Sequence, residues 1–262
     1  MHFLHMAWLN FKGQRAAFNL EEFLLLETAY PFLTLMFHCV MAGYAFDTTN
    51  LTDWVIGNAF LLCTNICVFS LGSSFRAERA YGRIRSIMVG KTSKIEIVLQ
   101  KGFFSGLVSL VTTFLGFMAG CVVFSVSLAD IPWGGILLCF ITAMFAAMGF
   151  GLVLSVLGLM SHQMHLILNL MEYVLLIFTG SNFPVTQLPE VFQVVSYALP
   201  LTRSIAAARG IVNGVELNQV FILLSGEILV GIAYIILATA LVKYAERVAV
   251  KKGTLEMFHL YQ

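Results

Sequence analysis

Charged residues are scarce in this sequence. Only 11% of its 262 residues are Asp, Glu, Lys or Arg, and 59% are hydrophobic, whereas soluble domains average about 25% charged and about 45–50% apolar residues. A soluble fold could not cover so apolar a composition with polar side chains, so the predicted surroundings are lipid. The net charge of +1 gives no electrostatic reason to expect a nucleic-acid partner.

The sequence also lacks the motifs of an enzyme. Gly90-Lys91-Thr92 suggests a phosphate loop, but Arg85 stands where the Walker pattern needs its first glycine. No zinc-protease motif, nucleophile elbow or paired-carboxylate signature is present. His162 and His165 supply only two metal ligands and are interpreted as a polar hinge, and the five cysteines form no CxxC pair. We predict no catalytic residue, metal site or cofactor on this chain.

Long apolar runs, in contrast, are abundant. A membrane-spanning helix needs about 20 apolar residues, and continuous runs of this length do not fit the alternating segments of about ten residues found in β-barrels. The predicted fold class is an all-α integral membrane protein with a single six-helix domain over 23–262. The six predicted spans are 23–46, 54–75, 103–128, 133–160, 165–181 and 219–242.

Basic residues are distributed asymmetrically about these spans. Thirteen of the 15 lie in the segment 1–22, in the segment 76–101 or after position 242. The loops 47–53 and 129–132 contain three aspartates and no Lys or Arg. By the positive-inside rule, both termini are predicted to be cytoplasmic in a multi-pass protein of the cell membrane, in agreement with an even number of spans.

Residues 1–22 are too polar to span a bilayer. Trp8, Phe11, Arg15 and Phe18 recur at helical spacings, which predicts an amphipathic helix lying along the cytoplasmic interface. A disordered tail is the alternative.

Segment 76–101 is longer than topology alone requires. Arg76, Glu78, Arg79 and Arg83 are spaced to continue the second span by one or two helical turns. A charged helical extension favours a cytoplasmic protein partner. Contact of a basic loop with anionic lipid headgroups is the alternative.

Segment 181–217, on the predicted external side, is neither a span nor a polar loop. Proline removes a backbone donor and clashes with the preceding turn, and three prolines interrupt this segment: Pro184, Pro189 and Pro200. Short helices that enter the membrane and return as a re-entrant hairpin fit the pattern, with a surface-lying cap as the alternative. Arg203 and Arg209, the two basic residues here, can hold freed carbonyls, carboxylates or lipid phosphates.

Three carboxylates fall inside predicted spans. Glu172 lies midway along the fifth, Glu227 about a third of the way along the sixth, and Glu27 one turn into the first. A charge at the centre of a spanning helix costs about 2.5–3.5 kcal/mol. Each is therefore a candidate for a pathway contact or an interhelical hydrogen bond, with a protonated structural glutamate as the alternative.

A secondary transporter or channel working without a partner is the rival function.

Two segments, 76–101 and 181–217, carry a family resemblance. The matching residues are Phe183-Pro184, Leu188-Pro189 and Leu199-Pro200-Leu201-Thr202, then Arg203, Arg209 and Gly214, and in the charged segment Glu78, Arg79, Gly82, Arg83 and Arg85. With these residues the sequence resembles the type-2 ABC exporter permeases of the drug, lipo-oligosaccharide and polysaccharide group. The resemblance implies that the charged segment contacts a separate ATPase subunit, which holds ATP and Mg²⁺, and that the chain forms a homo- or heterodimer with a second permease subunit. It does not fix a transported substrate.

Two GxxxG spacings occur in the third predicted span, Gly102–Gly106 and Gly116–Gly120. Small residues at this spacing let helices approach closely. They predict tight packing and give weak support for a seam with the second subunit.

Overall fold

The computed structural model describes residues 2–15, 29–75, 78, 93–126, 132–161 and 163–252. Within these ranges the regular elements are all helical and no strand occurs, which confirms the all-α prediction. The elements are α1 (His2–Arg15), α3 (Tyr30–Phe46), α4 (Thr52–Gly72), α7 (Lys94–Val123), α8 (Trp133–Met160), α9 (Met164–Phe178), the 3₁₀ turn η2 (Val185–Gln187), α10 (Glu190–Ala198), α11 (Thr202–Val212) and α12 (Leu217–Lys252).

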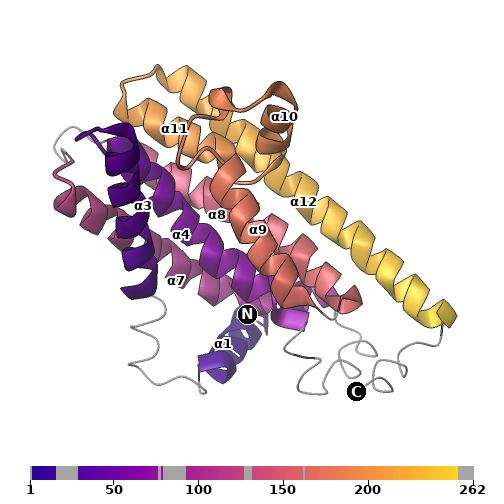
Figure 1. Ribbon diagram of the computed structural model, residues 1–262. Helices are drawn as coiled ribbons and strands as arrows, with labels where there is room; N and C mark the ends of the chain where they lie inside the picture. Colours follow the sequence, from indigo (N-terminus) through magenta and orange to yellow (C-terminus); the bar gives the residue numbers. More distant parts are fainter. Residues whose placement is uncertain are drawn as a thin grey trace.

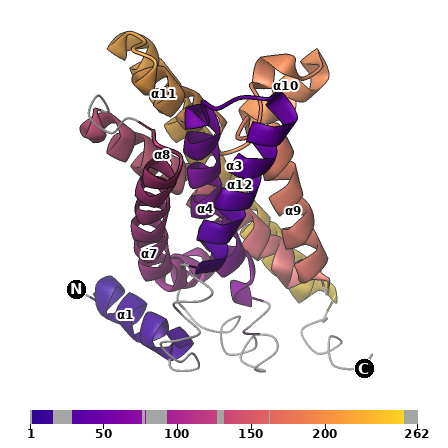
Figure 2. The ribbon, with the colours of Figure 1, turned by 60° about the vertical axis from the view of Figure 1, so that its left-hand side comes forward.

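Helix α4 occupies the middle of the bundle, where it contacts α3, α7, α8, α9 and α11. Helix α12 runs along α8 and also contacts α11, while α1 packs on α7. Figures 1 and 2 show α10 and α11 at one end of the bundle. Helix α1 and the C-terminal end of α12 lie at the opposite end (Figure 1).

Three of the described helices are long and apolar enough to cross a membrane by length and composition: Lys94–Val123, Trp133–Gly158 and Leu217–Ala245. Helices α3 and α9 are apolar but shorter. The chain is therefore built as an integral membrane protein. Six spans remain a prediction.

Helix boundaries differ from the predicted spans mainly where charged residues continue a helix. Helix α8 begins and ends as predicted, but α7 begins at Lys94 and α12 runs on to Lys252. In the first turns of α7, Gln100 donates a hydrogen bond to Glu96 at 3.2 Å. Apolarity marks the part of a helix that suits lipid, and Lys, Glu, Gln and Arg are good helix formers that extend it.

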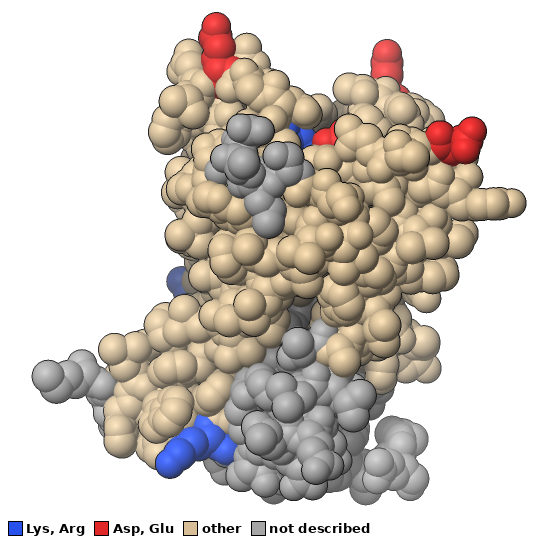
Figure 3. Space-filling model, turned by 90° about the vertical axis from the view of Figure 1, so that its left-hand side faces the viewer, with Lys and Arg blue, Asp and Glu red and all other residues tan. Residues whose placement is uncertain are grey.

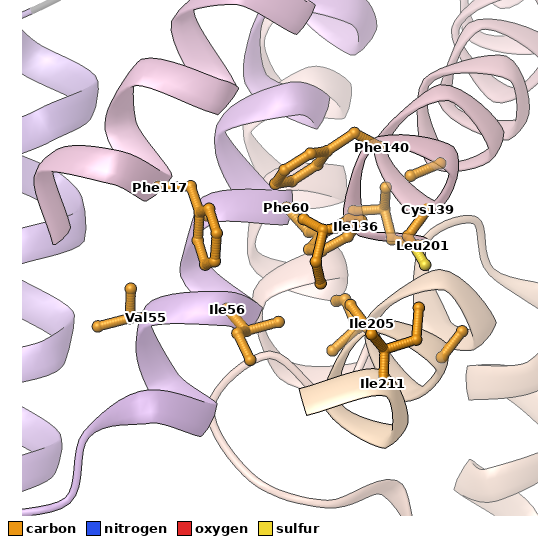
Figure 4. Close-up of a cluster of buried hydrophobic side chains, with 14 of the residues drawn as sticks. Val55, Ile56, Phe60, Phe117, Ile136, Cys139, Phe140, Leu201, Ile205 and Ile211 are labelled. Atoms are coloured by element: carbon orange, nitrogen blue, oxygen red, sulfur yellow. The ribbon is translucent and has the colours of Figure 1, made fainter. Parts of the chain in front are cut away.

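The main hydrophobic core joins α3, α4, α7, α8, α11 and α12. Figure 4 shows Leu201, Ile205 and Ile211, at and within α11, facing side chains of α4 and α8. The rings of Phe60 on α4 and Phe140 on α8 are 4.4 Å apart at their centroids. This core lies directly beneath α11 and fixes that helix against the bundle.

Glycines permit the closest helix approaches. A Cβ atom on Gly149 of α8 would lie 2.8 Å from the carbonyl oxygen of Gly231 on α12, so these helices cross backbone to backbone. On α7, an added Cβ would meet Leu71 at Gly102, Leu62 at Gly116, and Val55 and Leu35 at Gly120. The predicted tight packing is present, but these three glycines face α3 and α4 of the same chain. The suggestion that they form a seam with a second subunit is wrong for them.

Charged side chains are few on the face in Figure 3. The acidic residues lie at one end, while basic side chains are visible at the opposite end, at one side and next to the acidic residues. Large apolar side chains are exposed along α3 at a helical spacing: Tyr30, Leu33, Phe37, Val40 and Tyr44. An exposed apolar stripe of this length suits lipid or another membrane helix.

Candidate functional site

The chain from Thr179 to Val212, which we call the proline corner, is divided into short helices by its prolines. Pro184 directly precedes η2, and Pro189 directly precedes α10. Pro200 lies between α10 and α11, followed by Leu201 in a left-handed conformation with φ of 76°. The break into short helices agrees with the prediction, because each proline lies where a helix cannot continue.

Glu227 of α12 holds the beginning of α11. Its Oε1 accepts a hydrogen bond from the backbone N–H of Leu201 at 2.6 Å. Its Oε2 accepts from Arg203 N–H at 3.1 Å and from Ser204 N–H at 3.3 Å. The carboxylate is fully buried. It satisfies N–H groups that the first turn of a helix leaves unpaired. In the structure, Glu227 therefore makes hydrogen bonds between α12 and α11.

Arg203 and Tyr234 hold the end of α10. The Arg203 guanidinium donates from Nη1 to the carbonyl oxygen of Tyr197 at 2.6 Å and lies 5.6 Å from that residue's ring centroid. Tyr234 of α12 donates its hydroxyl hydrogen to the carbonyl oxygen of Ala198 at 2.7 Å. A Cβ at Gly226 would lie 2.8 Å from Cδ of Arg203, so the glycine makes room for the arginine stem. Both donors satisfy carbonyls that α10 leaves unpaired at its C-terminus.

Arg209 joins three elements. Its Nε and Nη2 donate to the carbonyl oxygen of Asp53 on α4 at 3.1 and 2.9 Å. Its Nη1 donates to Gly180 and its Nη2 to Ser181, both at 2.7 Å, just beyond the end of α9. Four hydrogen bonds in a planar fork are what arginine offers and lysine does not.

Burial lowers the pKa of the Arg209 guanidinium, while the Asp53 carboxylate acts in the opposite direction. That carboxylate lies 4.0 Å from Nε. Because arginine's ordinary pKa exceeds about 12, Arg209 acts as a charged donor.

Helix α4 approaches the proline corner through two further residues. A Cβ at Gly57 would lie 2.1 Å from the carbonyl oxygen of Ser181 and 2.8 Å from Nη2 of Arg209. The Asn58 side chain donates to the side-chain oxygen of Asn182 at 3.1 Å. The proline corner is thus fastened to α4 on one side and to α12 on the other.

Of the predicted ATPase-contact residues, the structure describes only Glu78, and it is buried. It forms an ion pair with Lys101 of α7. Arg79, Gly82, Arg83, Arg85 and, in the first predicted span, Glu27 lie outside the described residues. Glu172 is half-buried on α9.

Several residues of the site were not predicted. Tyr234 lies two helical turns after Glu227, a spacing that places both on one face of α12 and could have been recognised. Asp53, Gly180 and Ser181 act through backbone carbonyls, which carry no signal in the side-chain sequence. Among the described residues no group of three or more His, Cys, Asp or Glu could hold a metal ion.

A bundle of apolar helices with a proline-broken corner at one end defines a helical membrane protein. Residues 25–213 match the family model of the ABC-2 type transporter. The chain belongs to this family, and its membrane domain is the non-catalytic permease component of an ABC transporter. The matched range includes Arg203 and Arg209 and ends just after α11, before Glu227. No curated protein matches the chain.

Proposed function

We propose that this chain forms the translocation pathway of an ATP-driven exporter and is moved by a separate ATPase subunit. The family match is the observation that carries the proposal. ATP and Mg²⁺ would be held by the ATPase subunit. A second permease subunit, identical or related, would complete the pathway, with lipid around both.

The proposed topology has six spans with cytoplasmic termini in the cell membrane. Helix α4 has 21 residues, the length of a span, and would join α3, α7, α8, α9 and α12. The basic residues of α1 and of the C-terminal end of α12 lie at the end of the bundle opposite α10 and α11 (Figure 1). This supports the orientation, because basic segments would face the cytoplasm. The proline corner would then lie on the external side.

We propose further that the proline corner is a re-entrant hairpin that closes the pathway externally. Its backbone groups are held by Glu227, Arg203, Arg209 and Tyr234. Irregular backbone at membrane depth is tolerated where protein satisfies its polar groups. Its attachment to both α4 and α12 would let a relative movement of these helices open or close it.

Purification from native membranes tests the proposed function. A tagged chain should retain an ABC ATPase subunit in mild detergent, and the complex should hydrolyse ATP in a vanadate-sensitive way. Retention of no ATPase, together with transport by the chain alone that Glu172→Gln abolishes, would instead support a secondary transporter or channel.

A further inference from the structure

At the end of the bundle that carries α1, one turn of α7 contacts both α4 and Glu78. We call residues 101–104 the junction turn. Lys101 pairs with Glu78, which comes shortly after α4. At Gly102, an added Cβ would lie 2.1 Å from Leu71 Cδ2, so α4 rests on the backbone of α7. Leu71 also belongs to a buried cluster with Phe75 of the same chain region and Val98 of α7.

The same turn also holds α1. The ring of Phe103 lies 6.0 Å from that of Phe3, measured between centroids. The ring of Phe104 lies 5.3 Å from Trp8 and 5.4 Å from Phe11. Aromatic pairs at these separations attract one another beyond the area that they bury. The junction turn therefore unites α1, α4, α7 and Glu78.

The ion pair is suited to fixing geometry. The side chains of Lys101 and Glu78 are only 11% and 7% exposed. A buried ion pair adds little net stability, because desolvation offsets the attraction, but loss of one partner leaves an uncompensated charge. The Glu78 carboxylate is thus engaged with a membrane helix of its own chain.

We propose that Glu78 and Lys101 are positioning residues that transmit ATPase movement to the membrane helices. This inference rests on the proposed function. The ion pair and the contact at Gly102 join the end of α4 to α7. A displacement imposed on either helix at this end therefore moves both together, with α1 attached, instead of separating them.

The α4–α7 unit reaches the proline corner. Towards the far end of α7, Gly120 faces Val55 of α4. Val55 lies between Asp53, whose carbonyl binds Arg209, and Gly57, which contacts Ser181. Displacement of the α4–α7 unit would therefore change the hydrogen bonds of Arg209 to Asp53 directly.

A cysteine at the proposed external side reports this transmission without knowledge of the cargo. Val215 is 39% exposed between α11 and α12. Val215→Cys would be introduced into a background without the five native cysteines. The complex with its ATPase, placed in nanodiscs, would be labelled with a maleimide with and without ATP and vanadate. The unaltered pair should give an ATP-dependent change in labelling rate.

Single charge reversals test the pair. Glu78→Lys and Lys101→Glu should each abolish the ATP-dependent change while the ATPase subunit stays bound and hydrolyses ATP. The double variant Glu78→Lys/Lys101→Glu should restore the change, since the ion pair can re-form with exchanged charges. If a reversal prevents insertion, Glu78→Gln should show the same loss. Glu96→Gln, which alters another partly buried glutamate near the start of α7, should leave the change intact.

The outcomes separate this inference from the proposed function. A normal response in both reversals, or no rescue in an assembled and hydrolysing double variant, would overturn the role of the pair alone. Loss of ATPase binding in the single reversals would make the pair a docking element and would also overturn it. Failure of the unaltered chain to retain an ATPase would overturn the proposed function itself.

Discussion

A hydrogen bond joins Glu227 of α12 to Leu201 at the start of α11. The Glu227 Oε1 accepts from the Leu201 N–H at 2.6 Å, at a residue whose φ is 76°. A non-glycine residue in the left-handed region costs energy and needs its surroundings to hold it. The buried carboxylate of α12 supplies that support.

Removal of this carboxylate should loosen the proline corner. Glu227→Ala leaves the N–H groups of Leu201, Arg203 and Ser204 without their acceptor, at a cost of about 1–3 kcal/mol for each buried group left unsatisfied. We expect a lower thermal unfolding midpoint in detergent, measured by scanning fluorimetry. Glu216→Gln, at an exposed site before α12, is the matched control. Equal midpoints for the two variants would contradict the capping role.

Arg209→Lys should destabilise the protein although the charge is retained. Lysine has three donors on one nitrogen and cannot reproduce the four bonds that reach Asp53, Gly180 and Ser181. The expected result is a lower unfolding midpoint and less protein in the membrane, measured by scanning fluorimetry and quantitative immunoblotting. Arg247→Lys, at an exposed position near the end of α12, should change neither. Unaltered stability of Arg209→Lys would show that the fork is dispensable.

Gly57→Ala should disturb the contact between α4 and the proline corner. The added methyl group would lie 2.1 Å from the Ser181 carbonyl oxygen, and overpacking of this kind costs about 1–3 kcal/mol. Gly134→Ala is a demanding control, because nothing lies within 4 Å of the added Cβ and alanine favours a helix by up to about 1 kcal/mol. The thermal unfolding midpoint should fall in Gly57→Ala and rise slightly in Gly134→Ala. A neutral Gly57→Ala would mean that α4 does not approach the corner so closely.

The proposed orientation can be read from two exposed positions at opposite ends. In a cysteine-free background, Val215→Cys should react with an impermeant maleimide added to intact cells, because the proposed orientation places the proline corner outside. Lys12→Cys should react only after permeabilisation, because the same orientation places α1 in the cytoplasm. Labelling of position 12 from outside would reverse the topology.

Apolar runs predicted the helices well, and they predicted the ends of helices poorly. Helix α8 matches its predicted span because apolar residues fill it from Trp133 to Met160. Helix α7 starts earlier than predicted because Lys94, Glu96 and Lys101 are polar residues that still favour a helix. Apolar runs identify the part of a helix that suits lipid, so they do not predict the charged helical turns at its ends.

The proline corner was foreseen in outline and not in its contacts. Proline chemistry alone gives the division into short helices, and arginine chemistry suggests that Arg203 and Arg209 hold polar backbone. Their hydrogen-bond partners, such as the carbonyl oxygen of Asp53, depend on which helices pack together. Because these partners are backbone groups, the identities of the side chains do not predict them. The assignment of Glu227 to the start of α11 likewise needed the three-dimensional arrangement.

If ATP hydrolysis on a separate subunit moves this chain, the movement can be followed by the labelling rate of Val215→Cys in the assembled complex in nanodiscs. The rate is measured with the intact ATPase and with an ATPase whose Walker lysine is replaced. We expect an ATP-dependent change in rate with the intact ATPase and none with the inactive one. An identical rate under all conditions, in a complex that hydrolyses ATP, would contradict it.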